Sequence, residues 1–126
     1  MAPTQSPNMR IMMRAAEKAA RSLIRDFGET EQLQVSKKGP ADFVSAADRR
    51  AEEILFENLQ KDRPDFAFLM EESGEKGKEK AQYRWIIDPL DGTTNFLHGI
   101  PHWSISIALE ERKADDSREI IAALVA

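Results

Sequence analysis

The most constraining feature of this chain is the segment 85–95, which reads Trp-Ile-Ile-Asp-Pro-Leu-Asp-Gly-Thr-Thr-Asn. Three apolar residues end in Asp88, and a second acid, Asp91, stands just before a Gly-Thr-Thr sequence. This pattern predicts a strand that runs into a turn carrying two carboxylates. Carboxylates suit hard cations such as Mg²⁺, and the N–H groups of a Gly-Thr turn that opens a helix suit phosphate. The segment therefore predicts a metal-dependent phosphatase, although Asp-Pro and Asp-Gly pairs also form ordinary turns.

The composition limits the class of protein. With 126 residues, 41% hydrophobic and 32% charged, the chain is long enough for one globular domain with a modest core. A net charge of −4 argues against a nucleic-acid binder that works by bulk electrostatics. The absence of cysteine excludes disulfides, zinc-thiolate sites and cysteine nucleophiles, and it fits the cytoplasmic location that we expect. No run of about 18 apolar residues predicts a membrane span, and the first seven residues lack the apolar core of a secretory signal.

Two segments have the apolar spacing of helices. From residue 8 to residue 27, apolar side chains recur every four residues, at Ile11, Ala15, Ala19, Leu23 and Phe27. Gly28 is the expected stop. The second helix is expected over residues 45–61, with Ser45 as its N-cap and Asp48 in the third position of a capping box.

Four segments are expected as strands, at residues 66–70, 85–88, 104–109 and 119–125, with a polar loop at 74–80 and a hairpin turn at 113–117. Glu71 and Glu72 follow the first strand, as Asp88 and Asp91 follow the second. Consecutive strands are usually neighbours, and ligands bind at the carboxyl ends of strands in open α/β sheets. Converging carboxylates repel one another and raise each other's pKa. One or two divalent cations would relieve that repulsion and could activate water against a phosphate ester.

Several other polar residues have ordinary alternatives. His98 and His102 have no partner at a spacing that would complete a metal triad, so we expect packing or surface roles for both. Taken singly, the remaining residues also have ordinary explanations. These are a helix cap for Asp48, turn positions for Thr93 and Thr94, solvated loop acids for Glu71 and Glu72, and surface charges for Lys37 and Lys38.

Three blocks of the sequence, taken in order and spacing, carry a further implication. They are Lys-Gly-Pro-Ala-Asp-Phe-Val-Ser-Ala-Ala-Asp at 38–48, Glu-Glu-Ser at 71–73, and the string from residue 85 to residue 96 that ends in Asn-Phe. Together they resemble the inositol monophosphatase family. The resemblance implies an α/β (α+β) layered sugar-phosphatase fold, here two long helices packed on a largely antiparallel sheet. Met70 stands where that family usually has glycine, a local difference that we expect to be tolerated.

The resemblance also implies a set of metal ligands. Glu71, Asp88 and the Leu90 carbonyl would hold a first Mg²⁺, and Asp88 with Asp91 would hold part of a second. Glu71 would also reach a weaker third metal. Two or three Mg²⁺ ions are thus expected in a complete site, with Li⁺ inhibiting by taking a Mg²⁺ position.

The remaining roles concern water and phosphate. The resemblance implies that Thr93, with its hydroxyl bonded to Asp48, deprotonates the attacking water with help from Glu71. The phosphate would lie against Asp91 and the N–H groups of Gly92 and Thr93. Supporting positions around the site are expected at Glu72, Lys37, Lys38 and Thr94.

The expected reaction is Mg²⁺-dependent hydrolysis of a phosphate monoester, inositol 1-phosphate to inositol and phosphate, by direct attack of metal-activated water. One alternative is a related phosphatase of bisphosphorylated nucleotides or of fructose bisphosphate. Another is a non-enzymatic interaction protein, because some bacterial relatives are tied to RNA synthesis. A third is an unstable truncation product without a function of its own.

The length of the chain bears on its activity. Complete family members carry a Trp-Asp-x-Ala motif in a second half, and no such motif occurs here. We therefore expect a tail at residues 1–7 and an N-terminal metal-binding domain at 8–126, with the C-terminal half absent and the chain alone weakly active or inactive. The last strand would leave an open edge, which predicts a homodimer.

Overall fold

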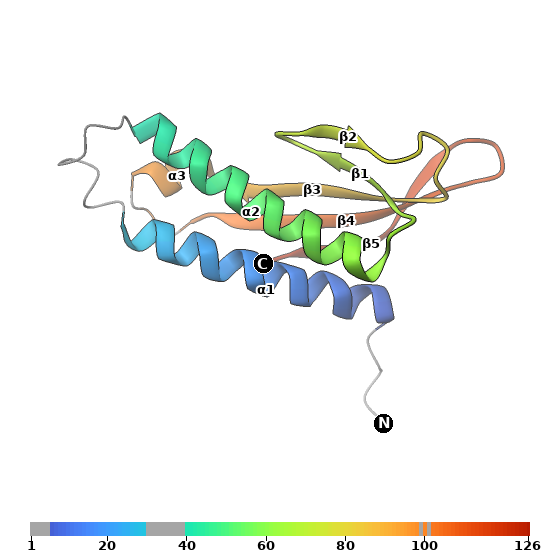
Figure 1. Ribbon diagram of the computed structural model, residues 1–126, viewed down its shortest axis with the longest axis horizontal. Helices are drawn as coiled ribbons and strands as arrows, with labels where there is room; N and C mark the ends of the chain where they lie inside the picture. The colour runs from blue at the N-terminus through green and yellow to red at the C-terminus, as the bar shows by residue number, and fades with distance from the viewer. Residues whose placement is uncertain (1–5, 30–39, 99, 101) are drawn as a thin grey trace, which may run out of the picture.

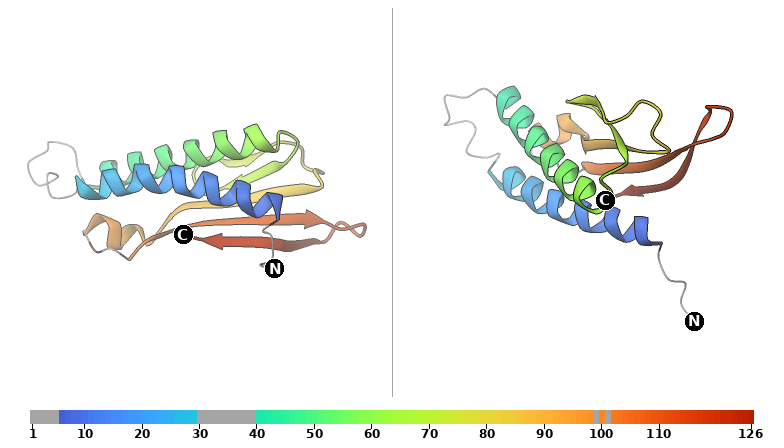
Figure 2. Two further views of the ribbon diagram at one scale, coloured as in Figure 1. Left: turned by 90° about the horizontal axis from the view of Figure 1, so that it is seen from below. Right: turned by 45° about the vertical axis from the view of Figure 1, so that its right-hand side comes forward.

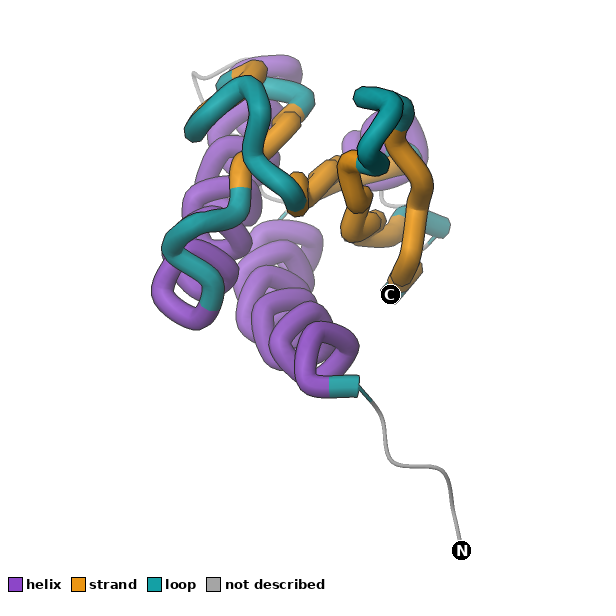
Figure 3. Tube along the Cα trace, turned by 90° about the vertical axis from the view of Figure 1, so that its right-hand side faces the viewer, coloured by secondary structure: helices purple, strands orange, loops and turns teal. Residues whose placement is uncertain are grey.

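The computed structural model describes residues 6–29, 40–98, 100 and 102–126, without the side chains of residues 40–43. Lys37, Lys38 and most of the expected tail lie outside these residues. Two long helices lie side by side across one face of a five-stranded sheet (Figure 1). The two layers are separate when the molecule is turned (Figure 2) and when it is viewed from its right-hand side (Figure 3). The expected fold class is confirmed.

Helix α1 runs from Pro7 to Gly28 and begins one residue before the predicted start. The Ser6 hydroxyl accepts a hydrogen bond from the Met9 N–H at 3.1 Å, which satisfies one of the unpaired donors of the first turn. Pro7 follows the cap, where its missing N–H costs nothing. Gly28 is the last helical residue and Glu29 is the C-cap.

Helix α2 runs from Pro40 to Asp62, so the predicted start at Ser45 is wrong. Proline is well suited to the first helical turn, and the helix continues through the positions that had been expected to precede it. Ser45 is thus not an N-cap, and Asp48 lies within the helix rather than in a capping box.

The sheet has the order β2-β1-β3-β4-β5. Only β1 and β3 are parallel, and the other three pairs are antiparallel. The hairpin turn at 113–117 is where it was expected, whereas β2 was missed because its short sequence is wholly polar apart from Gly74. The bounds of the strands are Ala67–Met70 for β1, Gly74–Lys76 for β2, Tyr83–Asp91 for β3, Ser104–Arg112 for β4 and Arg118–Val125 for β5.

The core lies between the helices and the sheet. Alternate residues of β3 and β4 point at the helices, among them Trp85, Ile87 and Ile107, and all are buried. Leu23 and Leu55 meet them from α1 and α2. Each such side chain contributes about 1.5–3 kcal/mol to folding when fully buried.

An aromatic cluster packs at the end of the sheet where β3 ends. Phe27 of α1 lies 5.6 Å from the ring of Phe96 and 5.6 Å from that of Trp103, and Phe96 lies 5.3 Å from Trp103. Phe96 belongs to the short helix α3, Thr93–Leu97. The turn before α3 is thus held against the rest of the core.

Among the described residues, no helix is both long and apolar enough to cross a membrane.

Candidate functional site

The parallel pairing of β1 with β3 brings acids from two segments of the chain together. Met70 lies opposite Ile87 in the ladder, so Glu71 follows next to Asp88. The carboxyl groups of Glu71 and Asp88 are close enough for Asp88 to be the largest cause of the raised pKa of Glu71. The expectation that the two acidic strand ends are neighbours is confirmed.

Helix α2 adds Asp48 to this group of acids. Asp48 is 5% exposed, and its carboxyl group interacts with that of Glu72. Its Oδ1 atom is buried and has no hydrogen-bond partner within the described part of the chain. Acids from α2, from the turn after β1 and from β3 therefore form one carboxylate cluster, made of Asp48, Glu52, Glu71, Glu72 and Asp88.

The cluster changes the proton affinity of two members. Burial, the hydrogen bond to Glu72 and the negative charges of Glu72, Glu71 and Asp88 raise the pKa of Asp48 to about 7. The hydrogen bond to Asp88, then burial and the charges of Asp88, Glu72 and Glu52, raise the pKa of Glu71 to about 7. Both groups exchange protons near neutral pH, which suits acid–base chemistry.

Glu52 is a member of this cluster that the sequence reasoning missed. Its Oε2 accepts a hydrogen bond from the Glu72 backbone N–H at 3.0 Å, and its Oε1 accepts one from the Ser73 hydroxyl. The signal was available, because a residue four positions after Asp48 on a helix lies on the same face. Glu52 was not identified because the Ser45 start placed Asp48 in the first helical turn.

The end of β3 and the turn after it are tightly bent. The Leu90 N–H donates to Asp88 Oδ1 at 3.3 Å, and the ladder with β4 shifts register between Asp88 and Asp91. Gly92 follows with φ +88°, which glycine adopts readily. A Cβ on Gly92 would lie 2.8 Å from the His102 carbonyl oxygen, so the turn packs directly on the segment before β4.

A hollow of about 460 Å³ opens beside this turn. Two of its lining residues are joined by a hydrogen bond, in which Asn95 donates from Nδ2 to the His102 carbonyl at 2.9 Å. His102 therefore lines a hollow next to the acids, whereas His98 is exposed at the end of α3. The lining residues are Asp91, Gly92, Asn95, His102, Trp103 and Ser104.

The remaining expected site residues lie around the same turn. Leu90 is buried, and Thr93 and Thr94 open α3 with exposed side chains. The bond expected between Thr93 and Asp48 stays a prediction, and Asp48 Oδ1 has no hydrogen-bond partner within the described residues.

The donor chemistry of the cluster fits a hard divalent cation. Carboxylate oxygens are the preferred ligands of Mg²⁺, and the unpartnered Oδ1 of Asp48 together with the raised pKa values shows negative charge that is poorly compensated. Within the described residues, however, no three Asp, Glu or His side chains already form a closed cation site. Cation binding would thus have to draw the acids closer together.

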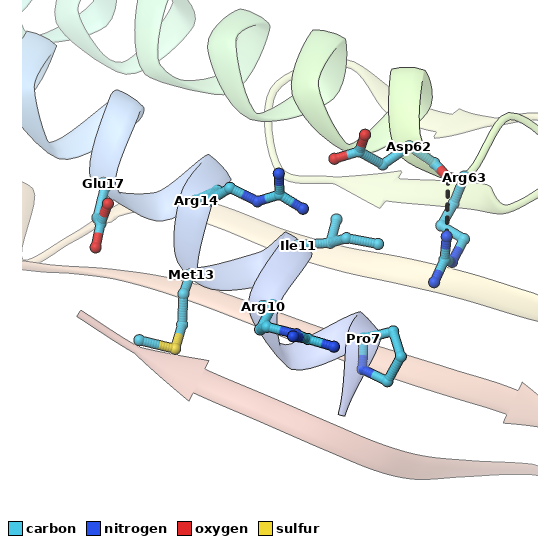
Figure 4. Close-up of a pocket in the computed structure, with 8 residues that line it drawn as sticks. All are labelled: Pro7, Arg10, Ile11, Met13, Arg14, Glu17, Asp62 and Arg63. Atoms are coloured by element: carbon cyan, nitrogen blue, oxygen red, sulfur yellow. Dashed lines mark hydrogen bonds between the residues drawn. The ribbon is translucent and has the colours of Figure 1, made fainter. Parts of the chain in front are cut away.

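Two other hollows are lined by charged side chains. One of about 610 Å³ lies between the start of α1 and the end of α2 (Figure 4), and Arg10, Arg14 and Arg63 line it together with Glu17 and Asp62. Arg63 there donates from Nε to Asn8 Oδ1 at 2.9 Å. The other lies at the start of β3, and two of its lining residues, Arg84 and Arg118, pair with the neighbouring Glu110 at 2.9 and 3.2 Å. The carboxylate cluster remains the strongest candidate site.

Comparison with known proteins identifies similar sequences. A model of the inositol monophosphatase family matches residues 4–122. An inositol-1-monophosphatase of Rhizobium meliloti is 57% identical over 122 residues, which cover 96% of this chain and 44% of that protein. A putative Nus factor SuhB of Neisseria meningitidis is 46% identical over 104 residues, which cover 82% of this chain and 40% of that protein.

Solved structures agree with this result. The extragenic suppressor protein suhB from Bartonella henselae superposes with a TM-score of 0.78 at 57% identity, covering 95% of this chain and 45% of that one. The chain spans about two-fifths of the length of the curated relatives that it matches.

Proposed function

Since this chain belongs to the inositol monophosphatase family, we propose that it supplies the cation-binding and phosphate-binding part of an enzyme that hydrolyses a phosphate monoester with Mg²⁺. Inositol 1-phosphate is the proposed substrate, because the Rhizobium meliloti relative is named an inositol-1-monophosphatase. The observation that carries the proposal is the carboxylate cluster itself, in which acids from α2, from the turn after β1 and from β3 interact and Asp48 Oδ1 is left without a partner in the described part of the chain.

The proposed cation ligands are Glu71, Asp88, Asp91 and the Leu90 carbonyl. Bound Mg²⁺ would neutralise phosphate charge and activate the attacking water. The carboxyl groups of Glu71 and Asp88 interact with each other, so a cation bound between them would relieve the repulsion between two negative charges. Li⁺ inhibition would follow from competition for the same oxygens.

The chain's own residues supply the proton and phosphate contacts. Asp48, with a pKa of about 7, is suited to take a proton from water at neutral pH, and Thr93 would hydrogen-bond to it in the proposed reaction. The first N–H groups of a helix have no intrahelical acceptors. Gly92 and Thr93 at the start of α3 would donate such groups to the phosphate, beside the hollow that Asp91 lines.

A graft tests this proposal. Residues 7–122 of this chain would replace the matching segment of the Rhizobium meliloti inositol-1-monophosphatase, and phosphate release from inositol 1-phosphate would be measured with Mg²⁺ and Li⁺ titrated. We expect Mg²⁺-dependent, Li⁺-sensitive release that Asp91→Asn reduces at least about 100-fold. A folded graft without release would overturn the proposal. The 126-residue chain alone is expected to show little or no release.

A second candidate is a non-enzymatic role in RNA synthesis. It is favoured by one observation, the 46% identity to a protein named a putative Nus factor SuhB. The net charge of −4 favours a protein partner over direct RNA contact. Retention of RNA polymerase by the immobilised chain, with an unrelated acidic protein as control, would support it, and no retention would exclude it.

A further inference from the structure

The turn that follows β1 is tied to α2 by one buried carboxylate. Glu52 is 4% exposed, and its two oxygens accept from consecutive residues of that turn. Oε2 accepts from the Glu72 N–H at 3.0 Å, and Oε1 accepts from the Ser73 hydroxyl. Hydrogen bonds to an ionised carboxylate are roughly twice as strong as neutral ones.

The same turn connects β1 and β2, and the pairing of Met70 with Gly74 closes it. β1 ends at Met70, so the ladder with β3 stops before the turn begins. Glu71, Glu72 and Ser73 are all exposed, and Gly74 follows with φ +72°. The pairing with β2 closes the turn but does not direct it toward α2. That direction comes from the two hydrogen bonds to Glu52, beside the contact between the Glu72 and Asp48 carboxyl groups.

We propose that Glu52 is a positioning residue, which holds the turn of residues 71–73 against α2 and so aims the carboxylates of Glu71 and Glu72 at Asp88 and Asp48. The effect of Glu52 on cation binding rests on the proposed function, whereas the positioning of the turn by Glu52 does not. The hydrogen bonds of the Glu52 oxygens go to Glu72 and Ser73, which are not among the proposed cation ligands.

Charge alone does not explain Glu52. Its carboxylate adds a fifth negative charge to a cluster in which the acids already repel one another. A glutamine would fill the same space without that cost. Its Oε1 could accept from the Glu72 N–H while its amide donates to the Ser73 hydroxyl, since a hydroxyl both donates and accepts. Glutamine thus separates the hydrogen bonds of Glu52 from its charge.

The experiment compares Glu52→Ala and Glu52→Gln with Glu53→Ala, which removes the same charge from the next, exposed residue of α2. Hydrogen exchange of the Glu72 amide is measured in the metal-free chain, and Mn²⁺ affinity is measured from the electron paramagnetic resonance of free Mn²⁺. We expect Glu52→Ala to raise the exchange rate and weaken Mn²⁺ binding, each roughly tenfold. Glu52→Gln and Glu53→Ala should stay within about threefold of the parent.

Each contrary result has a distinct meaning. Unchanged exchange of the Glu72 amide in Glu52→Ala would show that Glu52 does not position the turn. Faster amide exchange with unchanged Mn²⁺ affinity would show that the turn does not position the cation ligands. If Glu52→Gln weakened Mn²⁺ binding as much as Glu52→Ala, the charge of Glu52 would be what matters. A parent chain that binds no Mn²⁺ would sink the proposed function, while amide exchange would still decide the role of Glu52.

One more variant keeps the inference testable if Glu52→Ala unfolds. Ser73→Ala removes a single bond from the exposed turn and leaves α2 untouched. An intermediate loss of Mn²⁺ affinity is expected in a chain whose urea unfolding matches the parent. No loss in Ser73→Ala together with an unfolded Glu52→Ala would count against the inference.

Discussion

Met70 and Ile87 are partners in the parallel ladder between β1 and β3, and their pairing sets Glu71 beside Asp88. The two acids come from segments 17 residues apart and share one hydrogen bond, which is the largest cause of the raised pKa of Glu71. The candidate site thus depends on the register of one pair of strands.

Asp88→Asn should lower the pKa of Glu71 from about 7 toward its ordinary 4.5, because both the carboxylate hydrogen bond and the charge of Asp88 are lost. Carbon-13 titration of the Glu71 carboxyl group checks this. The same substitution should weaken Mn²⁺ binding at least about tenfold. Asp65→Asn, at an exposed position outside the cluster, is the matched control and should change neither quantity. A Glu71 pKa that stays near 7 would show that burial, not Asp88, dominates.

The metal-free chain should lose stability as the pH rises from about 4 to about 7. Asp48 and Glu71 have pKa values of about 7 in the folded chain against 3.8 and 4.5 ordinarily, so the folded state keeps protons that the unfolded state releases in that window. The loss in the free energy of unfolding that is due to Asp48 should be of order 1–3 kcal/mol. Urea unfolding at pH 5 and pH 8 measures it.

Two comparisons isolate the cause of that pH dependence. Asp48→Asn should flatten it, because the amide does not titrate. Saturating Mg²⁺ should restore stability at pH 8 more than at pH 5, since the cation competes with protons for the same oxygens. Equal pH dependence in the parent and in Asp48→Asn would show that other groups are responsible.

Gly92→Ala should destabilise the chain by about 2–4 kcal/mol, because φ is +88° and the new Cβ would lie 2.8 Å from the His102 carbonyl oxygen. Gly28→Ala is the matched control, since nothing lies within 4 Å of its Cβ position at the end of α1. That variant should be neutral or gain up to about 1 kcal/mol. Thermal unfolding compares the two, and equal melting temperatures would contradict the strained turn.

The chain should self-associate through β5. This strand pairs only with β4 among the described strands, and it exposes Ile120, Ile121 and Val125 by 49%, 43% and 70%. Open edges with apolar side chains favour pairing with a second copy. Sedimentation velocity should show dimers that Ile120→Lys with Val125→Lys converts to monomers. A monomeric parent at high concentration would refute this prediction.

Local patterns in the sequence were enough to identify most elements and most of the acids. The apolar period placed α1 within one residue of its start and located four of the five strands. The polar strand β2 could not be found in this way, because its pairing with β1 decides its conformation rather than any apolar alternation. The start of α2 was also misplaced, because Ser45 and Asp48 imitate a capping box within a continuous helix.

By itself, the sequence determined where the carboxylates and the Gly-Thr turn lie along the chain, because turn chemistry and strand alternation act over a few residues. Only the tertiary structure decided that Glu52 holds a turn 20 residues away, that Asp48 bonds Glu72, and that Asp48 and Glu71 share raised pKa values. Burial and the distances between charges set these properties, and both arise only when α2 packs across the ends of β1 and β3.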